Sequence, residues 1–102
     1  MDRISTFQSF IARSPDDPFP RYGLAMELRN RGDTDAALRE FVTLMDRFPD
    51  YVPTYLMAGN TLAERGRVDE AKDVYQRGLA AAQRKGDHHA AGELEGALAG
   101  LA

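Results

Sequence analysis

Apolar residues recur along the chain at intervals of three and four positions, which is the spacing of one face of an α-helix. Leu24 and Leu28 show it in one stretch, and Ala37, Phe41 and Leu44 show it in the next. Short polar segments that contain glycine, proline or aspartate separate these stretches. The pattern predicts a chain built from helices joined by tight turns.

The pattern repeats after 34 residues. The segment LRNRGDTDAALREF (28–41) has the same rhythm as LAERGRVDEAKDVY (62–75). The matched positions are Pro15 and Pro49, Asp16 and Asp50, Leu28 and Leu62, Arg31 and Arg65, Gly32 and Gly66, Asp35 and Asp69, Ala37 and Ala71, and Phe41 and Tyr75. They fall at turns and at small packing positions, where a structural repeat is most constrained, so the chain contains two copies of one unit.

Each unit is predicted to hold two helices. In the first unit, Asp17 caps a helix that has Pro18 in its first turn. Gly32 ends that helix in the left-handed conformation, and Asp33 is one of the residues that offer a cap to the next. Phe48-Pro49 ends the second helix. The second unit repeats this order from Tyr51, with Pro53 near the helix start and Gly66 at the inner turn.

This 34-residue unit resembles the tetratricopeptide repeat, whose pattern has Leu-Gly and Tyr positions in its first helix and Ala, Phe and Pro positions afterwards. The matching residues are Leu24, Ala37, Phe41 and Pro49 in the first unit and Gly59, Ala71 and Tyr75 in the second, with Leu28 and Leu62 at the Tyr position. The resemblance implies an all-α fold of antiparallel helix-turn-helix repeats stacked in a right-handed superhelix. The chain departs from the pattern at Arg21 and Tyr55, which take the Trp position, and at Gln83, which replaces the closing proline. The missing proline predicts a longer helix, ending at Arg84 or Lys85.

The resemblance covers the whole chain as a single domain of about six helices, residues 1–102. Residues 2–14 fit a half-repeat helix, 17–50 the first repeat, 51–86 the second and 88–101 a closing helix. Since one helical hairpin cannot bury its apolar face alone, the flanking helices are expected to cover the two ends. Their apolar stripes are Ile4, Phe7, Phe10 and Ile11 at one end and Ala91, Leu94, Leu98 and Leu101 at the other.

In this family the first helices of successive units line a concave groove that usually holds an extended peptide. The positions expected there are Phe19, Tyr22, Met26, Arg29 and Asn30 from the first unit and Leu56, Met57, Asn60 and Glu64 from the second. The apolar members predict an interaction surface, with Arg29 and Asn60 supplying directional contacts. The alternative is that a neighbouring helix or the C-terminal segment covers them. Tyr22, Met26 and Met57 stand where a clamp for an acidic peptide terminus needs Lys and Asn, which argues against such a clamp.

Gly92, Gly96 and Gly100 recur every four residues in the last predicted helix. Each costs about 1 kcal/mol against alanine in a helix interior. The stripe is interpreted either as a frayed terminal helix or as a smooth seam. Such a seam would pack against the preceding long helix or against a second copy of the protein.

Composition narrows the remaining possibilities. The net charge is −3, with acidic and basic residues spread over both halves, so nothing points to a nucleic acid or a membrane surface as partner. The chain has no cysteine, no signal peptide and no spanning segment, so the cytoplasm is the expected compartment. His88-His89 are adjacent and diverge on a helix, so they do not form a metal site. No nucleotide-binding, protease or hydrolase motif is present, so neither a cofactor nor an enzyme activity is expected.

The sequence therefore predicts a protein–protein interaction module that binds a peptide or a partner helix through an apolar concave groove. The alternative is a self-assembling scaffold, in which the groove or the C-terminal glycine seam joins copies into a homo-oligomer.

Overall fold

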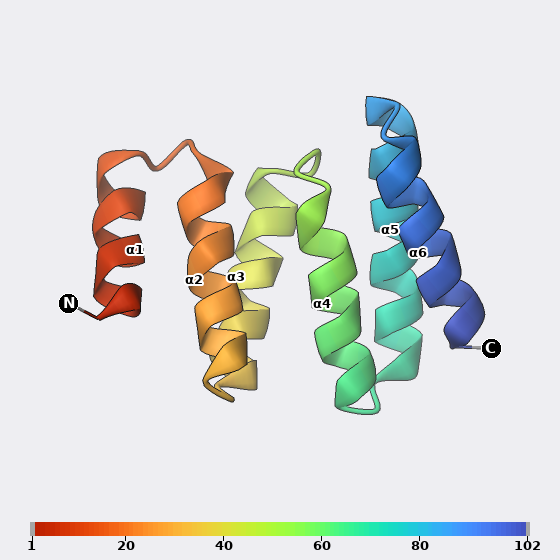
Figure 1. Ribbon diagram of the computed structural model, residues 1–102, viewed down its shortest axis with the longest axis horizontal. Coiled ribbons are helices and arrows are strands. Elements are labelled where there is room, and N and C mark those ends of the chain that lie inside the picture. The colour runs from red at the N-terminus through yellow and green to blue at the C-terminus, as the bar shows by residue number, and fades with distance from the viewer. Residues whose placement is uncertain (1, 102) are drawn as a thin grey trace. The chain divides into compact units, whose positions relative to one another are not determined.

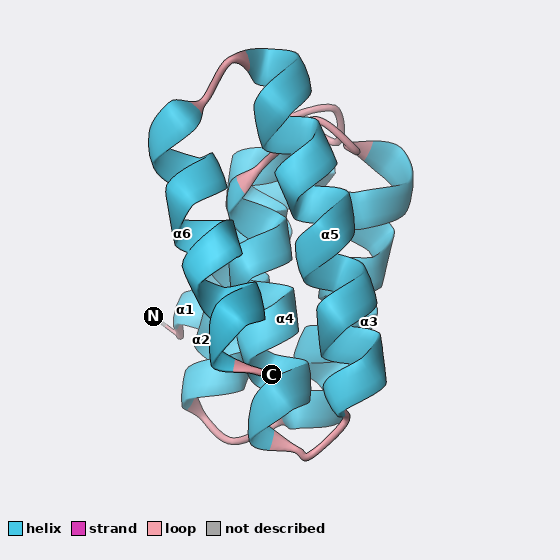
Figure 2. Cartoon of the chain, turned by 90° about the vertical axis from the view of Figure 1, so that its right-hand side faces the viewer, coloured by secondary structure: helices cyan, strands magenta, loops and turns pink. Residues whose placement is uncertain are grey.

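A computed structural model describes residues 2–101, and over these residues the protein is all-α, without a strand (Figure 2). The described chain contains six helices, as predicted (Figure 1). They are α1 (Arg3–Arg13), α2 (Pro18–Asn30), α3 (Thr34–Arg47), α4 (Pro53–Glu64), α5 (Val68–Lys85) and α6 (His88–Gly100). Their contacts divide the chain into two compact units, one ending at Phe48 and the other beginning at Pro49.

Side-chain caps and left-handed glycines set the helix ends. Asp17 starts α2 by accepting a hydrogen bond from the Phe19 N–H at 3.0 Å, and Asp87 starts α6 in the same way from Ala90 at 3.0 Å. Gly32 and Gly66 have φ angles of 84° and 76°, the left-handed region that was predicted for both turns. These four helix ends follow from local chemistry, whereas α4 and α5 start without a side-chain cap.

The second helix of the second repeat is longer than its counterpart, as the missing proline predicted. α5 runs to Lys85, and Gly86 at φ 69° then ends it. Without a proline at position 83, every residue up to Lys85 keeps an N–H that can donate within the helix.

In the first unit, α2 contacts both α1 and α3. Between α2 and α3 an ion pair joins Arg21 to Glu40 at 2.9 Å, and both side chains are mostly buried, with 18% and 22% exposed. The buried hydrophobic residues of α2 and α3 are Leu24, Ala25, Ala37, Phe41, Leu44 and Met45. α1 differs from its neighbours because none of its residues is fully buried.

In the second unit, α5 contacts α4 and α6, and α4 also touches α6. Glycines allow these close approaches. A Cβ built at Gly59 would lie within 2.8 Å of three ring atoms of Tyr75, and one built at Gly78 would clash with Tyr55 and lie 3.1 Å from a methyl group of Leu94. Leu94 is 1% exposed, which confirms its predicted place in the stripe of the closing helix, while Leu101 follows α6 as its C-terminal cap.

The three regularly spaced glycines of α6 do not pack against α5. A Cβ built at Gly92, Gly96 or Gly100 meets no atom of the described residues within 4 Å. The interpretation of a seam with the preceding long helix was therefore wrong, because α6 turns Leu94 and not its glycines toward α5. A seam with a second copy stays a prediction.

Candidate functional site

A hollow of about 450 Å³ lies between α1 and α2 in the first unit. Four of the residues expected on the groove line it together, namely Phe19, Tyr22, Met26 and Asn30. The complete lining is Arg3, Thr6 and Phe7 from α1 and Phe19, Tyr22, Gly23, Met26, Glu27 and Asn30 from α2. The structure thus brings the predicted residues of the first unit, except Arg29, to the lining of one hollow.

The helical repeat of α2 explains why these residues share a face. Tyr22 lies three positions after Phe19 and Met26 four positions after Tyr22, so successive turns of the helix stack them. Phe19 is 64% exposed, which is unusual for a phenylalanine in a folded chain, whereas Tyr22 and Met26 are half-buried. Arg29 is half-buried on the same helix but does not line the hollow.

Phe7 of α1 forms the inner wall of the hollow against Gly23 of α2. A Cβ built at Gly23 would lie within 3.0 Å of three ring atoms of Phe7, so the ring occupies the space that a larger residue would fill. A second, smaller hollow of about 280 Å³ shares Phe7 and Phe19 with the first and adds Phe10, which is 45% exposed. The three phenylalanines therefore form one apolar strip that joins the two hollows.

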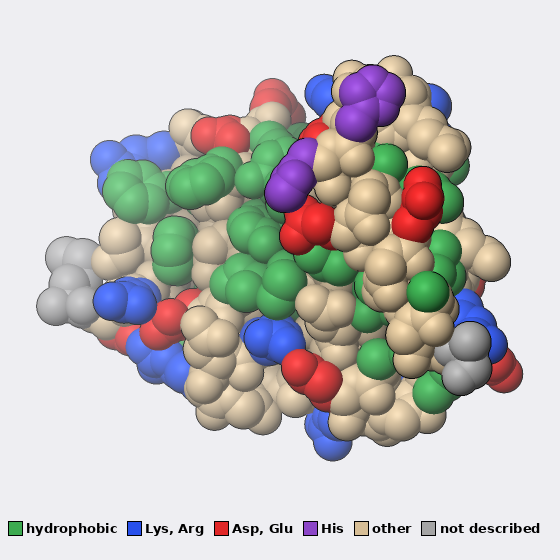
Figure 3. Space-filling view, turned by 45° about the vertical axis from the view of Figure 1, so that its right-hand side comes forward, with side chains coloured by type: hydrophobic (Ala, Val, Ile, Leu, Met, Phe, Trp, Pro, Cys, Tyr) green, Lys and Arg blue, Asp and Glu red, His purple; other side chains and the backbone are tan. Residues whose placement is uncertain are grey.

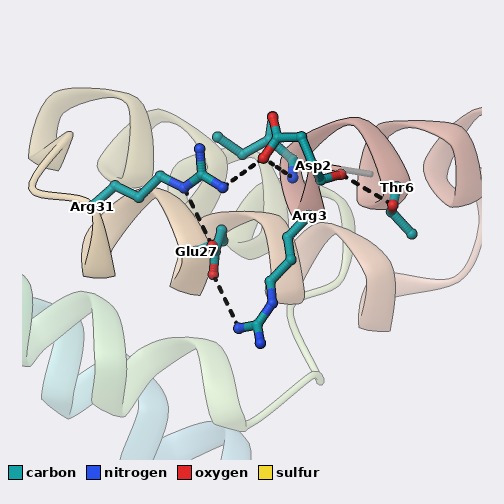
Figure 4. Close-up of polar contacts among 6 residues, drawn as sticks. Asp2, Arg3, Thr6, Glu27 and Arg31 are labelled. Atoms are coloured by element: carbon teal, nitrogen blue, oxygen red, sulfur yellow. Dashed lines mark hydrogen bonds and ion pairs between the residues drawn. The ribbon is translucent and has the colours of Figure 1, made fainter.

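A group of ion pairs closes one end of the α1–α2 contact (Figure 4). Arg31 lies 2.5 Å from the Asp2 carboxylate and 3.2 Å from Glu27, and Glu27 also lies 3.8 Å from Arg3. The Arg31 guanidinium holds the pKa of Asp2 below its ordinary value, through a hydrogen bond to that carboxyl. Asp2 also caps α1, since its side chain accepts from the Ile4 N–H at 3.4 Å. Charged groups thus fasten the start of α1 to the end of α2.

The predicted residues of the second unit, Leu56, Met57 and Asn60, are half-buried on α4. The Asn60 side-chain oxygen accepts a hydrogen bond from the Tyr75 hydroxyl at 2.5 Å, and its amide nitrogen lies 3.9 Å from the Met57 sulfur. A tyrosine hydroxyl is protonated at neutral pH and can donate, and burial raises the pKa of the Tyr75 hydroxyl further above that range. Asn60 consequently uses its oxygen and one amide N–H within the unit, which leaves its second amide N–H for another molecule.

Sequence reasoning missed the contribution of α1 to the hollow. Arg3, Thr6 and Phe7 had been assigned to a helix that merely covers the end of the stack, and Gly23 had no assigned role. A glycine inside a helix between apolar neighbours is a signal of close approach, and Gly23 carries that signal.

Both histidines lie exposed on the surface, where they are coloured purple in Figure 3, and the His89 Nε2 lies 3.3 Å from the Glu93 carboxylate. Residues 2–101 contain no group of three or more His, Cys, Asp or Glu side chains placed to hold a metal ion. None of the six helices combines the length and the apolar character needed to cross a membrane.

Comparison with known proteins places these features in a family. The model of the family described as Tetratricopeptide repeat matches residues 28–94. The crystal structure of a tetratricopeptide repeat domain protein from Salinibacter ruber is 35% identical, with a TM-score of 0.79, and the match covers 83% of this chain and 96% of that one. A protein from Bordetella parapertussis with a solution structure is 28% identical, with a TM-score of 0.82, over 99% of this chain and 88% of that one.

A curated relative agrees with this placement. A TPR repeat-containing protein of Pseudomonas aeruginosa is 24% identical over 91 residues, which cover 89% of this chain and 87% of the relative. The matched segment of the family model includes both copies of the repeated motif that the sequence shows. The chain belongs to the tetratricopeptide repeat family.

Proposed function

We propose that this protein binds an apolar segment of a protein partner in the hollow between α1 and α2. Tetratricopeptide repeats generally mediate protein–protein interactions and are generally not enzymes, which gives the class of function. The observation that carries the proposal is the exposure of Phe19, at 64%, on the wall of a 450 Å³ hollow.

Burial of apolar surface supplies the binding free energy in this proposal. Covering a phenylalanine side chain completely contributes about 1.5–3 kcal/mol, so Phe19 is the side chain that gains most from a partner. Met26 at the other end of the hollow is unbranched and fits side chains of different shapes. Asn30 at the rim is exposed and can donate to and accept from a partner's backbone.

We also propose a second contact surface on α4, made of Leu56, Met57 and the second amide N–H of Asn60. Leu56 and Met57 are half-buried, so each retains some apolar surface that a partner could cover. A single variant, Met57→Glu, tests this surface separately from the α1–α2 hollow.

The test is a peptide selection followed by a binding measurement. A random peptide library displayed on phage would be selected on the wild-type protein, and the affinity of the recovered peptides would be measured by calorimetry. We expect Phe19→Asp to weaken their binding at least tenfold, because it places a carboxylate in the apolar hollow. Val42→Asp is the matched control, since Val42 is a 50% exposed hydrophobic residue of α3 that does not line the hollow.

Circular dichroism would first establish that both variants fold. Peptides that bind Phe19→Asp as tightly as wild type would contradict the proposal, and so would peptides that both aspartate variants weaken equally.

A further inference from the structure

The repeat register shows which kind of helix borders the hollow. Phe7 of α1 lies 34 residues before Phe41 of α3, which lies 34 residues before Tyr75 of α5. α1, α3 and α5 are therefore second helices of a repeat, while α2, α4 and α6 are first helices. The pair α1 and α2 therefore matches the pair α5 and α6, because each is a second helix followed in the chain by the first helix of the next repeat.

In the second unit, a further first helix packs against such a pair of helices. There α4 packs against α5, with Gly59 receiving the Tyr75 ring, and also touches α6. In the first unit the pair α1 and α2 borders a hollow, and no residue of α1 is fully buried. An added helix that contacted α1 and α2 there would be the counterpart of α4, and by position in the repeat it would be a first helix.

We propose that the occupant of the hollow is α6 of a second copy of this protein. The proposal rests on the proposed function, because it requires that the hollow accepts an apolar segment. α6 is a first helix, and only Leu94 among its residues is fully buried. Ala91, Ala97 and Leu98 are half-buried, so they retain apolar surface for a further contact.

Charge complementarity favours α6 as the occupant. α1 carries Arg3 and Arg13 and no acidic residue, whereas α6 carries Glu93 and Glu95 and neither lysine nor arginine. The Arg3 side chain is 79% exposed and that of Glu93 is 49% exposed, so both can reach another molecule. Opposite charges on the two helices favour the α1–α6 pairing and disfavour α1–α1 and α6–α6 pairings.

This contact is heterologous, because each copy uses one surface as receiver and a different surface as occupant. Association therefore continues beyond a dimer, and salt weakens it because the charged groups are exposed.

The test uses charge reversal and mixing at pH 7.5 and low ionic strength. Sedimentation velocity over a concentration series would measure association of the full chain. We expect Arg3→Glu/Arg13→Glu to weaken self-association at least tenfold, and Glu93→Arg/Glu95→Arg to do the same. Mixing the two variants restores association, because each then presents the charge that the other lacks. The control Arg39→Glu/Arg77→Glu makes the same net-charge change as the α1 reversal, at exposed positions of α3 and α5, and leaves association unchanged.

Several results would overturn the inference. The first is that the wild-type protein stays monomeric at millimolar concentration. The second is that the α1 and α6 reversals leave association intact. The third is that the reversal variants fold but their mixture does not associate. The peptide experiment separates this failure from failure of the proposed function. If selected peptides bind wild type and lose affinity with Phe19→Asp, the hollow binds partners and only the second copy is wrong.

Discussion

At the scale of single residues, glycine has three different uses in this chain. Gly32, Gly66 and Gly86 end helices in the left-handed region, while Gly59 makes room inside a helix for the ring of Tyr75. Gly96 lies in a helix and meets nothing within 4 Å among the described residues. The same residue type therefore has opposite consequences for stability at different positions.

Alanine substitution distinguishes the packed glycine, Gly59, from the unobstructed one, Gly96. We expect Gly59→Ala to lower the free energy of unfolding by about 1–3 kcal/mol, because its Cβ overlaps the Tyr75 ring. Gly96→Ala is expected to raise it by up to about 1 kcal/mol, since alanine favours the helix and nothing obstructs its methyl group. Urea unfolding followed by circular dichroism at 222 nm measures both values. A Gly59→Ala protein as stable as wild type would show that the ring of Tyr75 moves aside without cost.

At the scale of helices, α1 is fastened by charged groups more than by buried surface. Asp2 pairs with Arg31 of the α2 terminus, and Arg47 at the end of α3 donates to the Pro15 carbonyl at 3.2 Å. Arg47 also lies 3.7 Å from Asp16. Exposed ion pairs contribute little each and are screened by salt, and α1 has no fully buried residue, so we expect α1 to open more readily than the other helices.

The Asp2–Arg31 pair gives this opening a pH dependence. Because Arg31 lowers the pKa of Asp2 in the folded protein, the stabilisation is present above the unfolded pKa of about 3.9 and is lost as pH falls through the lower folded value. We expect the hydrogen-exchange protection of α1 amides to fall relative to that of α5 amides below about pH 4 and at high salt. Exchange measured by NMR at pH 6 and pH 3 tests this.

Removing the charge of Arg31 should abolish most of that dependence. Arg31→Gln is expected to lower α1 protection at pH 6 and to make it nearly insensitive to pH. Arg67→Gln is the matched control, because Arg67 pairs with exposed Glu70 and lowers its pKa in the second unit. If the control variant changes α1 protection as much as Arg31→Gln does, the local ion pair is not what holds the helix.

At the scale of the whole molecule, the fold was more predictable than the hollow. The 34-residue register, the caps at Asp17 and Asp33 and the end of α5 at Lys85 depend on local chemistry and repetition, which a sequence displays directly. The contact of Phe7 with Gly23 depends on how two helices face each other, which periodicity alone does not specify. Tyr75 donates to Asn60 for the same kind of reason, since residues fifteen positions apart meet only through packing.

Each unit contains an aromatic ring held against a glycine, which allows a test of whether the two units are independent. Phe7 packs on Gly23 in the first unit and Tyr75 on Gly59 in the second, and the two pairs share no residue. Substitutions that share no partner usually add within about 0.5 kcal/mol. We therefore expect the loss of unfolding free energy in Gly23→Ala/Gly59→Ala to equal the sum of the two single losses.

Gly59 and Tyr75 lie in contact within one unit and provide the comparison. If additivity depends on the absence of a shared contact, substitutions at these two positions must not be additive. Replacing Tyr75 by Leu removes the ring that Gly59→Ala would strike, so Gly59→Ala should cost less in a Tyr75→Leu protein than in wild type. Urea unfolding of the five variants and wild type gives both coupling energies. A coupling of 1 kcal/mol or more between Gly23 and Gly59 would mean that the units unfold as one structure with shared strain. If Gly23 and Gly59 are not coupled while Gly59 and Tyr75 are, each unit is stabilised by its own contacts. This result is expected for a repeat protein, whose stability is a sum over repeats and their nearest neighbours.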